Sequence, residues 1–377
     1  MSPNISDEDD PNFVWFTGVP DATPLTPSLT ITDEDGSILQ ETNDFSVFTG
    51  IVYRNDTRAL EKYLEIGSWA IPRAPDIPPS LVGNSNAMDY FYKAAEDGCV
   101  DTLRMLLARG IRESTQFPAR IRFKERGYEL LHVAAKWGQH NLVQFLLENQ
   151  PLYAEIHERD PEGRTPILAA AHFYAIKFLA DETINPARNE RVVNLLLDHG
   201  ACAGDAVSFE NTGKPFETVL TLAARWASAD LIRRLIEEGA SIHTKVTKAK
   251  WAPGSSSHLE TFEVDALFIA CTFANLDAVK LIIGNLQVTM HGEEISHFQD
   301  NRGSFPIHWA TQNDSSPGLC RDWLLKEMVP NITSMIDFLL NLDPTTINAQ
   351  DNEGNTPLHY ATLAMGRHNG LFAPVFT

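Results

Sequence analysis

The chain has 377 residues, of which 43% are hydrophobic and 21% charged, a balance typical of a folded protein with a sizeable core. Its formal net charge of −20 argues against direct nucleic-acid binding, because phosphates need cationic contacts. The four cysteines are widely spaced and form no zinc or disulfide pattern, and no run of about 18 apolar residues predicts a membrane span. We therefore expect a cytoplasmic or nuclear protein without metal, cofactor or membrane contact.

Residues 1–42 form an acidic segment with several prolines and no sustained apolar period, which predicts a disordered tail. Within it, Phe13-Val14-Trp15-Phe16 lies between acidic clusters. Aromatic residues in acidic disorder can dock on coactivator-type grooves, so one interpretation of this tail is a role in transcription coregulation. The other interpretation is a solubilising leader, and the folded part is expected over residues 43–377.

A repeated unit begins near Phe45: a short helix ending in two small residues, a tight bend, and a second helix with two aliphatic residues near its end. The second small residue and the second aliphatic residue are 12 positions apart in five units: Val52 to Leu64, Ala95 to Leu107, Ala135 to Leu147, Ala224 to Ile236, and Cys271 to Ile283. Two further units lengthen this separation, to 26 residues between Ala171 and Leu197 and to 29 between Thr311 and Leu340. We expect insertions between their helices, at residues 172–191 and 312–332.

The turn and helix signals are clearest at residues 160–171. Asp160-Pro161-Glu162-Gly163 is a turn sequence, since proline presets φ at its second position and glycine closes its fourth. Thr165 is expected to cap the next helix through its hydroxyl, and Pro166 to be its first residue. Glycines in the left-handed conformation are expected to end the second helices at Gly110, Gly200 and Gly239.

Residues 351–361 read D-N-E-G-N-T-P-L-H-Y-A, which resembles the ankyrin signature D-x-x-G-x-T-P-L-H-x-A. Residues 300–310 repeat it with Phe305 in place of the threonine, and residues 130–135 keep its second half. The resemblance implies an all-α repeat solenoid, an array of about eight ankyrin units over residues 43–377 with the last incomplete. It also implies a structural role for the signature histidines, which would bond to the adjacent turn at His132, His308 and His359.

The chain departs from the family in the length of its units. Ankyrin repeats recur about every 33 residues, whereas successive second-helix ends here are 39 to 57 residues apart. Residues 241–264 alternate like two facing strands, so we expect a long β-hairpin finger there, in addition to inserted helical segments. Across that finger, lysines are expected to face acidic residues: Lys245, Lys248 and Lys250 opposite Glu260 and Glu263.

The family resemblance implies that a partner protein binds the concave surface formed by the hairpin tips and first helices. The two residues that directly follow each small pair are expected on that surface. In four consecutive units the second of these two residues is aromatic: Trp137, Phe173, Trp226 and Phe273. With Lys136 and Arg225 beside them, these aromatics are candidate binding residues, because aromatic and arginine side chains dominate protein interfaces. The alternative is that each aromatic packs on a neighbouring helix, and a large loss of stability in Trp226→Ala would favour it.

Catalytic signals are absent from the sequence: no G-x-x-x-x-G-K-S/T, G-x-G-x-x-G or G-x-S-x-G string occurs. The sequence therefore predicts a scaffold or adaptor that binds another protein through the groove and fingers. Two narrower forms of this prediction are a transcription coregulator and a part of a larger regulatory protein. The alternative hypothesis is an enzyme whose two insertions close a pocket over the groove.

Overall fold

A computed structural model of the protein describes residues 29–32, 38–42, 50–51, 54–66, 90–112, 129–150, 153–172, 186–208, 213–251, 259–289, 298–312 and 322–367. The chain divides into two compact units, residues 1–68 and residues 69–377, and each is described by itself. The boundary predicted between residues 42 and 43 stays a prediction.

The described residues of the first unit include an antiparallel strand pair and a helix of ten residues. Strand β1 (Leu29–Thr32) pairs with β2 (Ile38–Thr42), with Leu29 opposite Thr42. Both strands combine aliphatic residues with threonine, which favours extended backbone, so the expected disorder of residues 1–42 is wrong over these strands. The segment from Phe13 to Phe16 lies outside the described residues. Helix α2 (Thr57–Ile66) begins after Asp56, whose Oδ1 accepts a hydrogen bond of 3.0 Å from the Ala59 amide.

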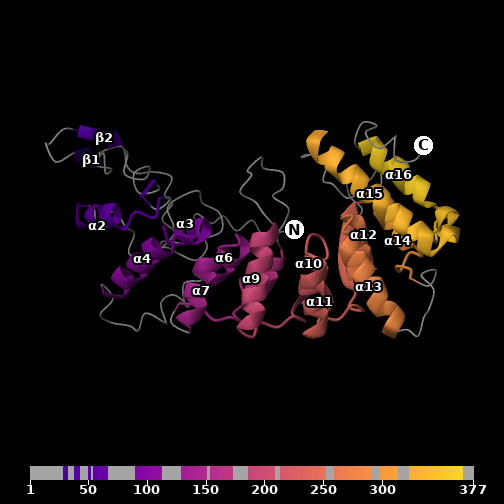
Figure 1. The fold of residues 1–377 in the computed structure, drawn as a ribbon, viewed down its shortest axis with the longest axis horizontal. Coiled ribbons are helices and arrows are strands. Elements are labelled where there is room, and N and C mark those ends of the chain that lie inside the picture. The colour runs from indigo at the N-terminus through magenta and orange to yellow at the C-terminus, as the bar shows by residue number, and fades with distance from the viewer. Residues whose placement is uncertain are drawn as a thin grey trace, which may run out of the picture. The chain divides into compact units, whose positions relative to one another are not determined.

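The second unit is a succession of helix pairs (Figure 1). The first helices of the pairs are α3 (Tyr90–Asp97), α6 (Leu130–Lys136), α8 (Pro166–Ala171), α10 (Val219–Ala223), α12 (Ala266–Thr272), α14 (Pro306–Gln312) and α16 (Pro357–Arg367). The second helices are α4 (Val100–Arg112), α7 (His140–Glu148), α9 (Pro186–Asp198), α11 (Ala229–Glu237), α13 (Leu276–Thr289) and α15 (Asp322–Leu342). The 3₁₀-helix η5 (Pro344–Asn348) leads into the last unit.

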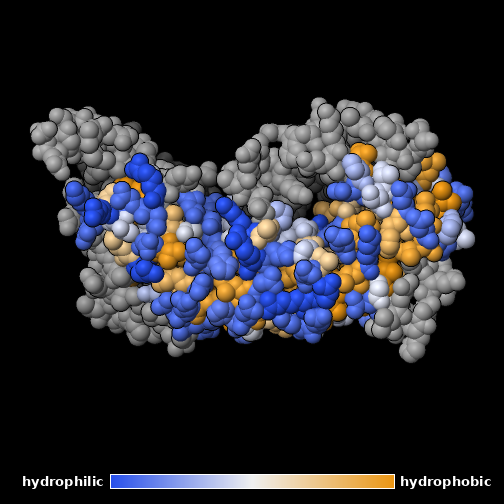
Figure 2. Space-filling view, in the orientation of Figure 1, coloured by the Kyte–Doolittle hydropathy of each residue, from blue (hydrophilic) through white to orange (hydrophobic). Residues whose placement is uncertain are grey.

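Contacts between neighbouring pairs build the core. Each first helix packs on the next, from α3 to α16, and the second helices α4, α7 and α9 pack in the same order, as do α11, α13 and α15. The small pair Ala134 and Ala135 is fully buried, and so is Leu146 on α7. Burying a leucine or isoleucine side chain contributes about 1.5 to 3 kcal/mol, so these inter-pair contacts hold the array together. Hydrophilic side chains cover α9 and α11 on the face shown in Figure 2.

The helix starts agree with the sequence in part. Pro166 begins α8 as predicted, but the Thr165 hydroxyl makes no cap and instead donates a hydrogen bond to Asp205. Side-chain caps occur at other starts: Thr218 accepts a bond of 3.1 Å from the Thr221 amide, Ser228 one of 3.3 Å from the Leu231 amide, and Asp265 one of 2.9 Å from the Leu267 amide. The local sequence identifies a residue that can cap a helix, but contacts with residues distant in the sequence decide which atom its side chain bonds.

Two of the three predicted closing glycines are confirmed. Gly200 and Gly239 have φ values of +91° and +104°, the left-handed region that favours glycine. The prediction is wrong for Gly110, because α4 continues to Arg112. The insertions are also shorter than expected, since α9 already begins at Pro186 and α15 at Asp322, which leaves residues 173–185 and 313–321 outside the described residues.

Two β-hairpin fingers join helix pairs. Strand β3 (Ala206–Ser208) pairs with β4 (Pro215–Thr218), and β5 (Val246–Trp251) pairs with β6 (Leu259–Val264), which confirms the predicted long finger. Lys250 lies opposite Glu260 as expected, but Lys248 lies opposite Phe262, and Glu263 lies opposite Thr247.

The lysines near this finger make lateral contacts. Lys248 Nζ donates to the Phe216 carbonyl in the preceding finger at 3.0 Å, and Lys214 Nζ lies 2.7 Å from Glu263 Oε1. The predicted cross-strand ion pairs of Lys248 and Glu263 are therefore replaced by contacts between adjacent fingers.

Candidate functional site

Two of the three signature histidines, His132 and His308, bond to the turn of the following unit, as predicted, whereas His359 Nδ1 accepts a hydrogen bond of 3.1 Å from the Thr356 amide in its own turn. His132 Nε2 lies 2.9 Å from the Glu158 carbonyl and 3.0 Å from the Arg164 carbonyl, and His308 Nε2 lies 3.2 Å from the Asn355 carbonyl. Burial lowers the pKa of both rings, which favours the neutral form at pH 7. These histidines tie units together, which is a structural role.

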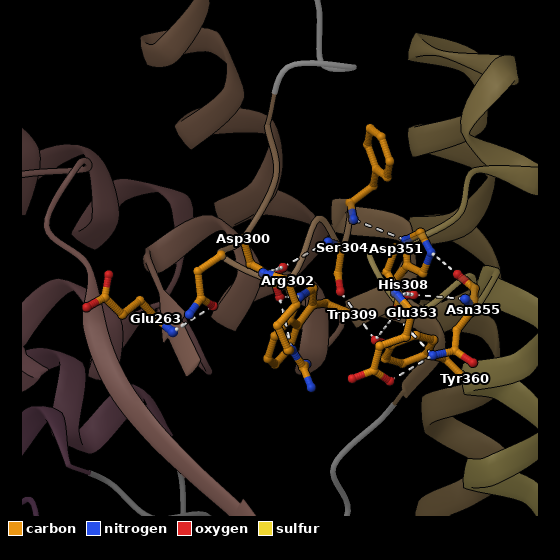
Figure 3. Close-up of polar contacts among 12 residues, drawn as sticks. Glu263, Asp300, Arg302, Ser304, His308, Trp309, Asp351, Glu353, Asn355 and Tyr360 are labelled. Atoms are coloured by element: carbon orange, nitrogen blue, oxygen red, sulfur yellow. Dashed lines mark hydrogen bonds and ion pairs between the residues drawn. The ribbon is translucent and has the colours of Figure 1, made fainter. Parts of the chain in front are cut away.

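A second polar cluster joins the last two described units (Figure 3). Asp300 accepts hydrogen bonds from the Ser304 amide at 2.8 Å and from Trp309 Nε1 at 3.1 Å. Asp351 repeats the arrangement one unit later, with Tyr360 Oη donating to it at 2.7 Å. Ser304 Oγ lies 3.2 Å from Tyr360 Oη and so connects the two carboxylates. The cluster holds adjacent turns together and is structural for the same reason as the histidines.

The predicted binding residues lie at the C-terminal ends of the first helices. We call the following residues the helix-end row: Lys136, Trp137, His172, Arg225, Trp226 and Phe273. Lys136 ends α6, and Trp137, His172 and Phe273 directly follow α6, α8 and α12. The predicted residue Phe173 lies outside the described residues.

The aromatic residues of the row differ in their surroundings. Trp226 is half-buried, and its Nε1 donates to the Ala171 carbonyl at the end of α8 at 3.0 Å. Phe273 is 39% exposed, and the Arg225 guanidinium lies 5.4 Å from the centre of its ring. Trp137 is half-buried, and its Nε1 has no hydrogen-bond partner among the described residues. Trp226 thus packs between units, whereas Phe273 offers an apolar surface beside a cation.

Lys136 and Arg225 also occupy different settings. Lys136 is exposed, and its carbonyl accepts a 3.1 Å hydrogen bond from Asn189 on α9. Arg225 is half-buried and faces Phe273 of the next unit. The structure therefore brings Arg225, Trp226 and Phe273 into one neighbourhood through α10 and α12, while Lys136 belongs to α6.

A buried carboxylate lies beside the row on β4. Glu217 Oε2 is 3.1 Å from Arg164 Nε, and its Oε1 is 3.3 Å from His172 Nδ1. Burial raises the pKa of Glu217, but bonding and charge from His172 and then from Arg164 outweigh it, so the pKa falls to about 2. Glu217 is therefore ionised at neutral pH.

Lys248 supplies a further cation close to this carboxylate. Burial lowers its pKa first, the positive charge of Arg225 lowers it further, and Glu217 opposes both, so the pKa is about 8. Geometry also places Lys248 close to Glu217, because Lys248 Nζ donates to the carbonyl of Phe216, which precedes Glu217 on β4. We call the set Arg164, Glu217, Arg225 and Lys248 the cationic cluster, because it contains three cations and one carboxylate.

The sequence prediction missed Arg164, Glu217 and Lys248. Arg164 follows the turn residue Gly163, a position that ankyrin-type units expose, so its place in the repeat was a usable signal. Glu217 and Lys248 lie in hairpin fingers, and their approach to Arg164 depends on how adjacent fingers stack. No local pattern carries that information.

Catalytic arrangements gain no support from the described residues. Within these ranges no group of three or more histidine, cysteine, aspartate or glutamate side chains could hold a metal ion. The two segments that the enzyme hypothesis needs, residues 173–185 and 313–321, lie outside the described part of the chain. In the same described part, no helix has the length and apolar character to cross a membrane.

Stacked helix pairs joined by turns and β-hairpin fingers define an all-α repeat solenoid. Residues 91–190 match the family model described as ankyrin repeats (3 copies), so this part of the chain contains ankyrin repeats. The crystal structure of the human ASB11 ankyrin repeat domain is similar to it, with 18% sequence identity and a TM-score of 0.44 over 77% of this chain and 97% of that one. No curated protein sequence matches the chain. Ankyrin repeats serve as scaffolds for protein–protein interaction.

Proposed function

We propose that the protein is a scaffold or adaptor that binds a partner protein through its concave groove and hairpin fingers, with the helix-end row in the contact. The observation that carries this proposal is Phe273, a large aromatic side chain 39% exposed beside the Arg225 guanidinium. Exposed aromatics next to arginine are typical of interface hot spots, because both bury much area on binding. The partner-binding residues are Lys136, Trp137, Phe173, Arg225, Trp226 and Phe273.

Affinity capture with quantitative mass spectrometry tests the proposal. The bait is the full chain, compared with Phe273→Ala and with Leu342→Ala as the matched control. Leu342 ends α15 and is also 39% exposed, so both variants remove an apolar side chain of equal exposure. We expect Phe273→Ala to reduce recovery of a specific partner about tenfold and Leu342→Ala to leave it unchanged. Equal recovery with all three baits would contradict the proposal.

A narrower role in transcription coregulation rests on the acidic segment around Phe13 to Phe16. In this form of the proposal the protein acts in the nucleus or cytoplasm, contacts other proteins, and makes no direct contact with nucleic acid, membrane or metal. Deletion of residues 1–42 should then reduce a transcriptional reporter signal. An unchanged signal would remove this role and leave the scaffold proposal intact.

A further inference from the structure

Two large apolar side chains are exposed in the last described repeat unit, at positions that other units bury. Leu358, the second residue of α16, is 55% exposed, whereas Ile167 and Ile307, the second residues of α8 and α14, are 1% and 3% exposed. Ile347 on η5 is 51% exposed, whereas Ile156, which also lies four residues before the aspartate of its turn, is 8% exposed. Because α8 and α14 each pack against the first helix of the following unit, the exposed side of α16 corresponds to a surface that a further helix covers elsewhere in the protein.

The histidine that follows in α16 has one ring nitrogen available for a partner. His359 Nδ1 accepts a hydrogen bond of 3.1 Å from the Thr356 amide, so the proton of the neutral ring is on Nε2. The corresponding ring of His308 uses Nε2 to bond the Asn355 carbonyl of the next turn at 3.2 Å (Figure 3). In the described part of the chain, His359 Nε2 has no such partner. A backbone carbonyl would complete this position.

The surroundings of these residues are acidic. Residues 327–366 include five aspartate or glutamate residues and no lysine or arginine. Two of the carboxylates lie close in the sequence to the exposed apolar residues: Asp343 precedes η5 and accepts a hydrogen bond of 3.0 Å from the Thr345 amide, and Glu353 is exposed in the turn before α16. Neither forms an ion pair with a residue that the structure describes. A positively charged partner would therefore be attracted here.

We call Ile347, Leu358 and His359 the α16 face, since η5 packs against α16 and brings these residues into one neighbourhood. A helix whose last turn is basic matches this face. The last four carbonyl groups of a helix have no partner within it, so one of them can accept a hydrogen bond from His359 Nε2. Lysine and arginine are favoured in the same turn, because the negative end of the helix dipole attracts them. Apolar side chains at helical spacing would pack on Leu358 and Ile347.

We infer that the α16 face binds the C-terminal part of a basic amphipathic helix that belongs to a partner protein. Charge disfavours a second copy of the chain in the same place, because two acidic α16 faces repel each other. The inference goes beyond the proposed function, since the α16 face shares no residue with the helix-end row. A scaffold with both surfaces would hold two partners at once.

Selection from a displayed library tests this chemistry. The full chain is immobilised and exposed to random peptides of about 18 residues, which is about five helical turns. Peptides that also bind a Leu358→Asp variant are removed by counter-selection. We expect the remaining peptides to carry apolar residues at helical spacing and lysine or arginine in their C-terminal half. Peptides rich in aspartate and glutamate, or the absence of any peptide that depends on Leu358, would overturn the inference.

Alanine variants connect a selected peptide to the α16 face. Leu358→Ala should weaken its binding about tenfold, because the apolar contact is lost. Leu342→Ala is the matched control and should change affinity by less than about twofold. Leu342 is also exposed, but it lies three residues after a buried leucine, a position that is exposed and polar in other units, as at His199 and Glu238. Both variants replace exposed side chains and should stay folded, which circular dichroism checks.

Two polar substitutions test the carbonyl and the charge. His359→Asn keeps an acceptor close to the Thr356 amide but lacks Nε2, and it should weaken binding about fivefold, the effect of one hydrogen bond. Glu353→Gln removes one exposed charge and should weaken binding about threefold at low salt and less in about 0.5 M salt, because salt screens the attraction. Binding that neither substitution changes would contradict a basic helix at this face.

Other occupants give different results. A dimer in sedimentation velocity that Leu358→Asp dissociates would assign the α16 face to a second copy and overturn the inference. Binding of the selected peptide only after deletion of residues 368–377 would assign the face to that segment of the chain, with the same consequence. Phe273→Ala should leave peptide binding unchanged, and a loss of binding in that variant would place the peptide at the helix-end row instead.

Discussion

The role of Trp226 can be decided by its effect on folding stability. The ring is half-buried, and its Nε1 donates to the Ala171 carbonyl of the preceding unit at 3.0 Å. Trp226→Phe removes this bond and should lower the free energy of unfolding by about 1 kcal/mol, the net value of a typical hydrogen bond. Trp226→Ala also removes the apolar area that the ring buries. A loss of about 100 Å² of buried area, at roughly 25 cal/mol per Å², adds about 2.5 kcal/mol to the loss of stability. We therefore expect a total loss of about 3.5 kcal/mol.

Urea unfolding followed by far-ultraviolet circular dichroism measures these differences. Trp137 offers a matched control, because its Nε1 has no hydrogen-bond partner among the described residues. Trp137→Phe should therefore change stability by less than about 0.5 kcal/mol, since the substitution breaks no bond there. A Trp226→Ala variant as stable as the wild type would refute the assignment of this ring to the packing between units and return it to the exposed stripe that the sequence predicted.

Three further substitutions test the core, a buried carboxyl and the turn cluster. Leu146→Ala, at a fully buried site, should cost about 2 to 5 kcal/mol in urea unfolding by leaving a cavity, and a cost under about 1 kcal/mol would contradict the packing described. Burial first, and then the charges of three neighbouring carboxylates, raises the pKa of Glu129 to about 7, so its contribution to stability is present at low pH and is lost as pH rises through about 7. Glu129→Gln should accordingly gain about 1 kcal/mol over the wild type between pH 5 and pH 8, a value reduced for solvent screening, and an unchanged difference would refute the shift. Tyr360→Phe removes the 2.7 Å hydrogen bond to Asp351 and should lower the free energy of unfolding by about 1 to 2 kcal/mol, with a lower melting temperature. An unchanged melting temperature would contradict the presence of this bond in solution.

The helix pairs could be predicted because their signals are local. Small residues near the end of one helix and paired aliphatic residues near the end of the next recur at a fixed spacing, and Ala135 and Leu147 are buried as that spacing requires. The long finger was predictable for the same reason, from the alternation of residues 241–264. Its lysine contacts were not, because Lys248 pairs with the finger beside it, and sequence alternation says nothing about which neighbour a side chain meets.

The candidate site was predictable only in outline. Repeat position identified Arg225 and Phe273, which the structure brings to within 5.4 Å of each other, measured from guanidinium to ring centre. The same reasoning treated Trp226 as equivalent to Phe273, although one donates a hydrogen bond to a neighbouring unit and the other is exposed. The exposure of a side chain at a helix end depends on the direction in which that side chain leaves the helix. When the helix ends one residue earlier or later, this direction changes.

Adjacent turns near the end of the array share backbone bonds as well as side chains. The Asn352 amide donates to the Arg302 carbonyl at 2.8 Å, although Asn352 itself is exposed. An amide held in this way is released to solvent only when the last two turns separate. The rate at which this amide exchanges with deuterium would therefore follow the separation of two adjacent repeat units, so that one exposed residue reports how often these units come apart.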